Sequence, residues 1–185
     1  MQRQKRGTPR QPETLAMLAK DHRMVQKLFK EFEKLDDGEE RREHVKKTCN
    51  ELRAHARLEQ EVFYPAIRRA LSEQDRDVDL IAEAEVEHTV AKNLIEELDH
   101  MTGTDDEHFS ATFCVLGDYV NHHIDEEENE LFKEIRRAKV DLSPLADEMR
   151  QRREALREEL GLEEAGEHER DYGADKEHDV TRRRT

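Results

Sequence analysis

The sequence has no tryptophan, and among its 185 residues there are only four prolines and seven glycines. Residues that end helices are therefore scarce, and the alternation of apolar and polar residues that marks strands is absent. Only 34% of the residues are apolar while 42% are charged, which favours long solvated helices over sheets. The length suits one domain of ordinary size. We therefore predict a single all-α domain.

Clustered basic charge and long apolar runs are also missing. The formal net charge of -14 argues against nucleic-acid or membrane binding, because phosphate contacts need clustered lysine and arginine. Arg3, Lys5, Arg6 and Arg10 form too short a stretch to reverse this, and residues 1–12 are interpreted as a flexible basic arm. No run of about 18 apolar residues exists, and no secretory signal is recognisable. A cytoplasmic protein is expected.

Cysteine is also scarce, with only two residues in the sequence. Cys49 and Cys114 have no CxxC partner, so a disulfide framework is not expected. Both lie in helical, partly apolar stretches, which favours buried thiols.

Four long helical segments are predicted between the few breakers. Asp36-Asp37-Gly38 and Thr102-Gly103 mark two turns, and Pro65 should kink the second segment or end its regular part. The predicted helices are Glu13–Leu35, Glu39–Ser72, Val78–Met101 and Asp106–Val140. They predict an antiparallel up-down four-helix bundle over residues 13–140.

A shorter fifth helix is predicted over residues 143–160. Ser143 offers an N-cap, Pro144 suits the first helical position, and an apolar stripe follows. This helix is expected to pack on the bundle or to form a homodimer. Residues 161–185 are charged and without period, which predicts a disordered tail.

The apolar registers of the four long helices indicate a diverged tandem repeat of a helical hairpin. The first and third helices carry the same steps of 3 and 4 residues at an offset of 66, with histidine third in both stripes. The second and fourth helices match at an offset of 68. The matched stripes read Leu15, Leu18, His22, Val25, Phe29, Phe32 against Ile81, Ala84, His88, Ala91, Ile95, Leu98, and Leu52, His55, Glu59, Phe63, Ile67 against Val120, His123, Glu127, Leu131, Ile135.

Histidine within an apolar stripe faces the interior, where a polar ring needs a partner. Residues i and i+4 share a helix face, so Glu59 lies beside His55 and Glu127 beside His123. Counting residues from the turns at ~1.5 Å rise places these groups and the two lone histidines within ~6 Å in height. Such a layer predicts a metal site for His22, His55, Glu59, His88, His123 and Glu127. This donor set suits iron, manganese or zinc, and carboxylates that bridge suit a pair of ions.

His122 and Glu126 form a third HxxxE pair. Gap-free alignment with the second helix selects His123 instead, because choosing His122 would displace the apolar pair Leu131-Phe132. His122 is therefore interpreted as a flanking residue.

The motifs Asp21-His22, His55-x3-Glu59 before Phe63-Tyr64-Pro65, Glu87-His88 and His123-x3-Glu127 before Leu131-Phe132 resemble the H-HxxxE-H-HxxxE pattern of the hemerythrin HHE cation-binding family. The resemblance implies a non-haem di-iron centre with two bridging carboxylates, with manganese or zinc as less favoured metals. Oxygen-carrying hemerythrins have a further histidine on the third helix, but here that position is Lys92.

With Lys92 in place of a fifth histidine, the number of coordination positions left open on the metals leads to a prediction about function. Two six-coordinate ions offer about twelve positions, of which the six donors and one bridging oxygen fill about ten. The two open positions favour reaction with hydrogen peroxide, oxygen or nitric oxide, including catalase-like chemistry. A reversible oxygen-binding or iron-sensing module without turnover is the alternative, and a metal-free structural bundle is a third. A ferritin-like site is disfavoured, because that class uses ExxH pairs and fewer histidines.

Further ligands or orienting groups are sought one turn from the histidines. Glu51 and Tyr119 each stand four residues before a ligand histidine, and Glu85 stands three before His88. Each is interpreted as a group that hydrogen-bonds and orients a ligand ring rather than as a seventh ligand. Asp21 and Glu87 are expected to be solvated.

Overall fold

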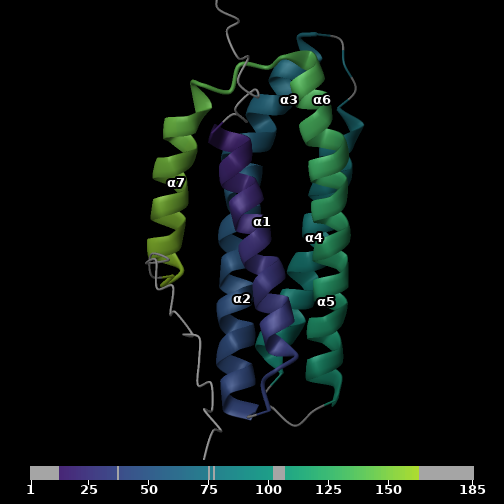
Figure 1. Ribbon diagram of the computed structural model, residues 1–185, viewed down its shortest axis with the longest axis vertical. Coiled ribbons are helices and arrows are strands. Elements are labelled where there is room, and N and C mark those ends of the chain that lie inside the picture. Colours follow the sequence, from purple (N-terminus) through teal and green to yellow (C-terminus); the bar gives the residue numbers. More distant parts are fainter. Residues whose placement is uncertain (1–12, 37, 75, 77, 102–106, 163–185) are drawn as a thin grey trace, which may run out of the picture.

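The computed structural model describes residues 13–36, 38–74, 76, 78–101 and 107–162. All regular structure within these residues is helical, as the all-α prediction requires. In chain order the elements are α1 (Glu13–Phe32), α2 (Gly38–Leu58), η1 (Glu59–Phe63), α3 (Tyr64–Ser72), α4 (Asp79–His100), α5 (Glu107–Glu126), η2 (Glu127–Leu131), α6 (Phe132–Ala138) and α7 (Leu145–Glu159). Helices α1, α2, α4 and α5 run side by side along the long axis, and α7 lies outside them (Figure 1).

The helix ends differ from the predicted ones by small amounts. The first helix ends at Phe32 rather than Leu35, and two tight turns follow it through Lys34 and Leu35. The third helix agrees with its prediction to one residue at each end. Asp106, the predicted start of the fourth helix, lies outside the described residues.

The second and fourth predicted helices each change type midway. Regular α-helix stops at Leu58, and a π-helical stretch of 5 residues precedes α3. Pro65 lies in the first turn of α3, where a missing backbone N–H is tolerated. An equal π-helical stretch, η2, precedes α6 with Lys133 at the matching position. Proline is therefore not the cause of the irregularity, and the prediction that assigned it to Pro65 is wrong in its reason.

Two clusters of buried apolar side chains fill the interior, one toward each end. The periodic stripes of the sequence supply both. The cluster nearer α3 and α6 contains Leu15, Leu18, Leu58, Phe63, Tyr64, Ile67, Leu71, Ile81, Leu131, Phe132, Ile135, Met149 and Leu156 among others, and the cluster nearer the opposite end contains Val25, Phe32, Val45, Cys49, Leu52, Ile95, Leu98, Phe109, Phe113, Leu116, Val120 and Ile124.

Helix α7 packs on α1, α2 and η1. Met149 and Leu156 are fully buried there. The helix begins at Leu145 with Pro144 before it, so the predicted Ser143 cap is one residue too early; the Ser143 N–H instead bonds Asp141 Oδ1 at 3.0 Å. At the other end, Gly161 has a φ of 65°, which glycine adopts without strain.

The start of the predicted tail is part of this helix end. Leu162 is buried, and its N–H donates to the Arg157 carbonyl at 2.8 Å, so disorder from residue 161 onward is wrong for these first two residues. Residues 163–185 and the predicted arm over residues 1–12 lie outside the described residues.

The structure also bears on the predictions about the two cysteines and about membrane-spanning segments. Cys49 is buried as expected, but Cys114 is exposed on α5, so its predicted burial is wrong. Among the described helices, none is long and apolar enough to span a bilayer.

Candidate metal centre

Six buried donors, three from each helical hairpin, lie between the two apolar clusters. In chain order they come from α1, α2, the first residue of η1, α4, α5 and the first residue of η2: His22, His55, Glu59, His88, His123 and Glu127. None is more than 7% exposed. The helical period that buries the apolar stripes also turns these side chains inward. The donor side chains are therefore withdrawn from the outer surface of the bundle.

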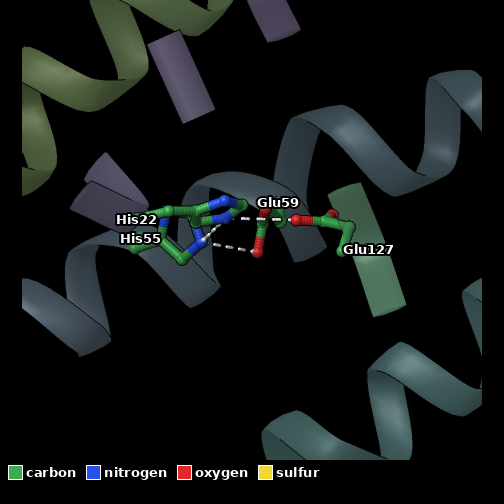
Figure 2. Close-up of side chains that lie close together, drawn as sticks. All are labelled: His22, His55, Glu59 and Glu127. Carbon is green, nitrogen blue, oxygen red and sulfur yellow. Dashed lines mark hydrogen bonds and ion pairs between the residues drawn. The ribbon is translucent and has the colours of Figure 1, made fainter. Parts of the chain in front are cut away.

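The first group of donors joins the α1–α2 hairpin to a glutamate of the other hairpin (Figure 2). His22, His55, Glu59 and Glu127 offer atoms that all lie within 4.8 Å of one another. His22 Nε2 is 3.1 Å from His55 Nε2 and 3.2 Å from Glu127 Oε2. The donor atoms therefore converge on one space that an ion can occupy.

The second group contains His88 and His123 together with Glu59. The Nε2 atoms of the two histidines are 3.1 Å apart. Glu59 Oε2 lies 3.3 Å from His88 Nε2 and also 3.3 Å from His55 Nε2 in the first group. One carboxylate thus reaches a histidine from each hairpin, which is the position of a bridging ligand.

Both glutamates stand at the start of the π-helical stretches. A π-turn inserts one residue relative to regular α-helix, and such turns are frequent at functional sites. Glu59 opens η1 and Glu127 opens η2, at equivalent places in the two hairpins. In both hairpins, the change from α-helix to π-helix therefore occurs at the level of the donor side chains.

The protonation of two histidines suits metal binding. Burial, reinforced by the neighbouring His22, lowers the pKa of His55 well below its ordinary value. Burial and the nearby His123 lower the pKa of His88 to about 3. Both rings are neutral, which is the form that binds a metal. Their Nδ1 atoms have no hydrogen-bond partner within the described part of the chain.

The buried carboxyl group of Glu59 lacks a compensating positive charge. Burial and the nearby Glu127 raise the pKa of Glu59 well above its ordinary value. Glu59 Oε1 has no hydrogen-bond partner among the described residues. An unpaired buried carboxylate is costly, so a cation would relieve a real deficit. Four imidazoles and two carboxylates fit first-row transition metals.

His22 differs from His55 and His88 in having a raised pKa. Burial opposes its charge, but ion pairs with Glu127 and Glu128 outweigh burial and raise the pKa to about 9. His22 Nδ1 donates to Glu128 Oε1 at 2.8 Å. Arg23 holds the same carboxylate through two hydrogen bonds of 2.6 and 3.0 Å. Glu128 therefore fixes the orientation of the His22 ring.

His123 has an equivalent anchor in Glu87. Its Nδ1 donates to Glu87 Oε2 at 2.7 Å, and this hydrogen bond lowers the pKa of the Glu87 carboxyl. Half-buried Glu87 is thus part of the centre, and the expectation that it is solvated is wrong. Each group of donors has one histidine anchored by a carboxylate.

Tyr64 connects the two glutamates. Its hydroxyl lies 3.4 Å from Glu59 Oε2 and 3.2 Å from Glu127 Oε1, and it can donate its proton to either. Burial and the two carboxylates raise the pKa of this hydroxyl well above its ordinary value. Tyr64 therefore stays protonated and orients the carboxylates.

Asp21 is also misjudged by the sequence. It is only 5% exposed, and Arg153 of α7 donates two hydrogen bonds to it, at 3.0 and 2.5 Å. The prediction of a solvated side chain fails because α7 covers this face.

The other residues sought as orienting groups contact different partners. Arg157 of α7 donates two hydrogen bonds to Glu51, at 2.5 and 3.2 Å, and Arg68 donates one to Glu85 at 2.8 Å. The Nδ1 atoms of His55 and His88 have no hydrogen-bond partner among the described residues, so neither glutamate orients its neighbouring ring. The predicted orienting role of these two residues is therefore wrong. Tyr119 lies in the wall of a cavity bordered by three of the histidines.

His122 and Lys92 both point away from the donor groups. His122 is exposed and lies 3.3 Å from Glu126, and these two residues form an outer group with Glu87, which also contacts His123. The side chain of Lys92 is 73% exposed and lies 3.8 Å from Glu96.

The spacing of the motifs did not indicate the residues that sequence reasoning missed. Glu128 directly follows a ligand glutamate and Glu87 directly precedes a ligand histidine. Consecutive residues on a helix point about 100° apart, so adjacency to an inward-facing residue does not indicate that Glu128 or Glu87 reaches the interior. Tyr64 was quoted only as part of an aromatic pair, and nothing in its spacing indicated contact with two carboxylates.

Comparison with known proteins addresses the same region. A family model described as the hemerythrin HHE cation binding domain matches residues 13–135. A DNA nickase of Nostoc sp. (strain PCC 7120) is 32% identical over 116 residues, which are 63% of this chain and 31% of that protein. The chain thus spans about a third of the length of this curated relative. No solved structure matches the chain.

Proposed function

The chain belongs to the hemerythrin HHE cation-binding family, and we propose that residues 13–140 form an up-down four-helix bundle that holds a pair of iron ions. His22 and His55 would hold one ion, and His88 and His123 the other. Glu59 and Glu127 would bridge them. The observation that carries this proposal is the position of Glu59 Oε2, 3.3 Å from a histidine of each hairpin. Bound iron would supply one-electron redox chemistry.

The favoured partner of this centre is hydrogen peroxide, oxygen or nitric oxide. Support comes from the side chain of Lys92, which points outward at the position where the resemblance would place a fifth histidine. The six described donors leave about two positions on a six-coordinate pair after a bridging oxygen. Tyr64 keeps an O–H beside both carboxylates, so a hydrogen-bond donor lies in the donor layer. These features suit turnover of a small oxidant.

Metal analysis combined with a peroxide assay tests the proposal. Protein loaded anaerobically with ferrous iron is expected to hold about two ions per chain and to evolve oxygen from hydrogen peroxide. Glu59→Ala should lose both properties. Glu61→Ala, two residues away and ion-paired at the surface, is the matched control that should keep them. If protein with a full complement of iron does not decompose hydrogen peroxide, the proposal that the centre is catalytic is wrong.

Reversible oxygen binding or sensing is the second candidate. It is favoured by the bond between Arg153 and Asp21, because this bond ties α7 to the residue next to His22. A change at the first donor group thus has a direct route to the outer helix. An oxygenated absorption band that vanishes on degassing would support this candidate. Rapid oxidation to an unreactive ferric form would count against it.

DNA is not proposed as a substrate. The word nickase describes a relative of which this chain spans about a third, and the net charge of -14 opposes contact with phosphates. Supercoiled plasmid should survive incubation with the iron-loaded protein. Nicking that disappears in Glu59→Ala would replace the peroxide proposal with a nuclease.

A further inference from the structure

A cavity of about 430 Å³ lies between α2, α4 and α5 and reaches the metal centre. Three of the four ligand histidines, His55, His88 and His123, form part of its lining. The rest of its inner wall is largely apolar and includes Leu52, Ala56, Ala91, Ile95, Val120 and Ile124.

Lys92 leaves this space open. It lines the cavity one turn after His88, but its side chain extends outward to Glu96. A side chain turned inward at this position would fill space beside His88. The cavity therefore adjoins the second donor group directly.

The size of the cavity exceeds what a diatomic molecule or peroxide needs. A water molecule takes about 30 Å³ in the liquid, so this cavity is larger by roughly a factor of ten. Pockets of about 300–1,000 Å³ with apolar walls and few polar groups are typical binding sites for organic molecules.

The charges around the cavity indicate an uncharged occupant. Arg53 of α2 pairs with Asp99 of α4 across the rim. Lys92 likewise faces Glu96. Arg57 bonds both Glu61 and Glu159. Because each of these cations already has a carboxylate, the rim offers no strong site for an anion, and the apolar wall would penalise a buried charge.

We propose that this cavity binds an uncharged apolar organic molecule, of the size of a two- or three-ring aromatic or a medium-length alkyl chain, against His55, His88 and His123. The molecule would then lie beside the metal pair as a second reactant or as a cover that excludes water. Its place next to a metal rests on the proposed function, whereas its binding to the cavity does not.

Titration of the metal-free full chain with 1-aminoanthracene tests the cavity, because the emission of this planar apolar fluorophore rises in apolar surroundings. Saturable binding to one site is expected. Ala91→Phe and Ala56→Phe, which fill the cavity from opposite walls, should each weaken binding by at least about tenfold. Val115→Phe, at a 53% exposed position on α5, is the matched control and should leave it unchanged. Thermal melting checks that each variant folds.

Affinities within about twofold of wild type for both folded filling variants would overturn the proposal. Competition identifies the charge class: 1-octanol should displace the fluorophore better than octanoate, and the reverse order would contradict an uncharged occupant. Metal analysis of the same preparations separates the two proposals. A chain that binds the fluorophore in an Ala91-dependent manner but takes up no iron would refute the metal centre and leave the cavity.

Discussion

The two helical hairpins contribute equivalent donors to the centre but differ in what covers them. His22, His55 and Glu59 of the α1–α2 hairpin correspond to His88, His123 and Glu127 of the α4–α5 hairpin. Helix α7 packs on the first hairpin and η1 and lies away from the second (Figure 1). Residues that match in both hairpins therefore relate to the centre, and residues that differ relate to the presence or absence of α7.

The residue types on the outer faces of the two hairpins depend on whether α7 covers that face. Under or beside α7 the first hairpin has apolar side chains where the second has charged or polar ones. The matched pairs are Met17 and Glu83, Ala54 and His122, Leu58 and Glu126, and Val62 and Glu130. In the second hairpin an acidic crevice lined by Glu83, Glu126 and Glu130 reaches His123 and Glu127. The donors are the same in both hairpins, as the proposed ligation of two metal ions requires.

The largest effect is expected where the hairpins are most alike. Glu59→Ala and Glu127→Ala should each reduce the iron content from about two ions to fewer than one per chain, because each removes a shared carboxylate. Elemental analysis after anaerobic loading measures this. Equal losses would support the equivalence of the two hairpins. Full retention of metal by either variant would show that its carboxylate is not a ligand, and the proposed bridge would then fall.

A smaller but still large effect is expected under α7. Arg157→Ala leaves Glu51, only 3% exposed, without its two hydrogen bonds, which should lower the free energy of unfolding by about 3 kcal/mol. Denaturant unfolding of the metal-free chain measures it. The second hairpin has no such pair, because Tyr119 occupies the position equivalent to Glu51.

Arg152→Ala on the same helix is the matched control. Arg152 bonds the more exposed Glu61, so its loss should cost at most about 1 kcal/mol. Equal costs for the two variants would contradict the difference in burial. Replacing Glu51 and Arg157 together by leucine should recover much of the lost stability, since no unpaired charge is then buried.

The sequence predicted the donor layer because helical period and residue spacing alone determine which side chains share a face. The repeated registers singled out His123 over His122 for the same reason. The all-helical fold and the family resemblance are confirmed.

Contacts between distant elements were beyond such reasoning. Asp21 meets Arg153 across 132 residues, and nothing local to Asp21 indicates it. Glu128 reaches His22 from the π-helical stretch η2. A π-turn is a shift in backbone hydrogen bonding that composition does not reveal. The sequence therefore predicted the donors better than the groups that hold them.

The smallest predicted effect uses a pair of matched histidines, His22 and His88, whose pKa values are shifted in opposite directions. His22 has a pKa raised to about 9, whereas the pKa of its counterpart His88 is lowered to about 3. The acid beside His22 is Glu128, whose own pKa is lowered to about 2 by its hydrogen bond with His22, and the equivalent position in the first hairpin is Gln60. Glu128→Gln therefore makes the two hairpins alike at this position.

In the metal-free chain, a histidine whose folded pKa lies above its ordinary 6.5 stabilises the fold fully below pH 6.5 and loses that contribution as the pH rises toward 9. Glu128 stabilises the fold fully at pH values above its ordinary pKa of 4.5 and loses that contribution as the pH falls toward 2.

The difference in unfolding free energy between wild type and Glu128→Gln should thus be greatest from about pH 4.5 to 6.5. It should be near 1 kcal/mol there, because solvent screens the partly exposed Glu128. Toward pH 9 it should shrink, since His22 then becomes neutral. Denaturant unfolding in the presence of a chelator measures it, and a difference that stays constant from about pH 6.5 to 9 would mean that His22 is neutral in the folded chain, like His88.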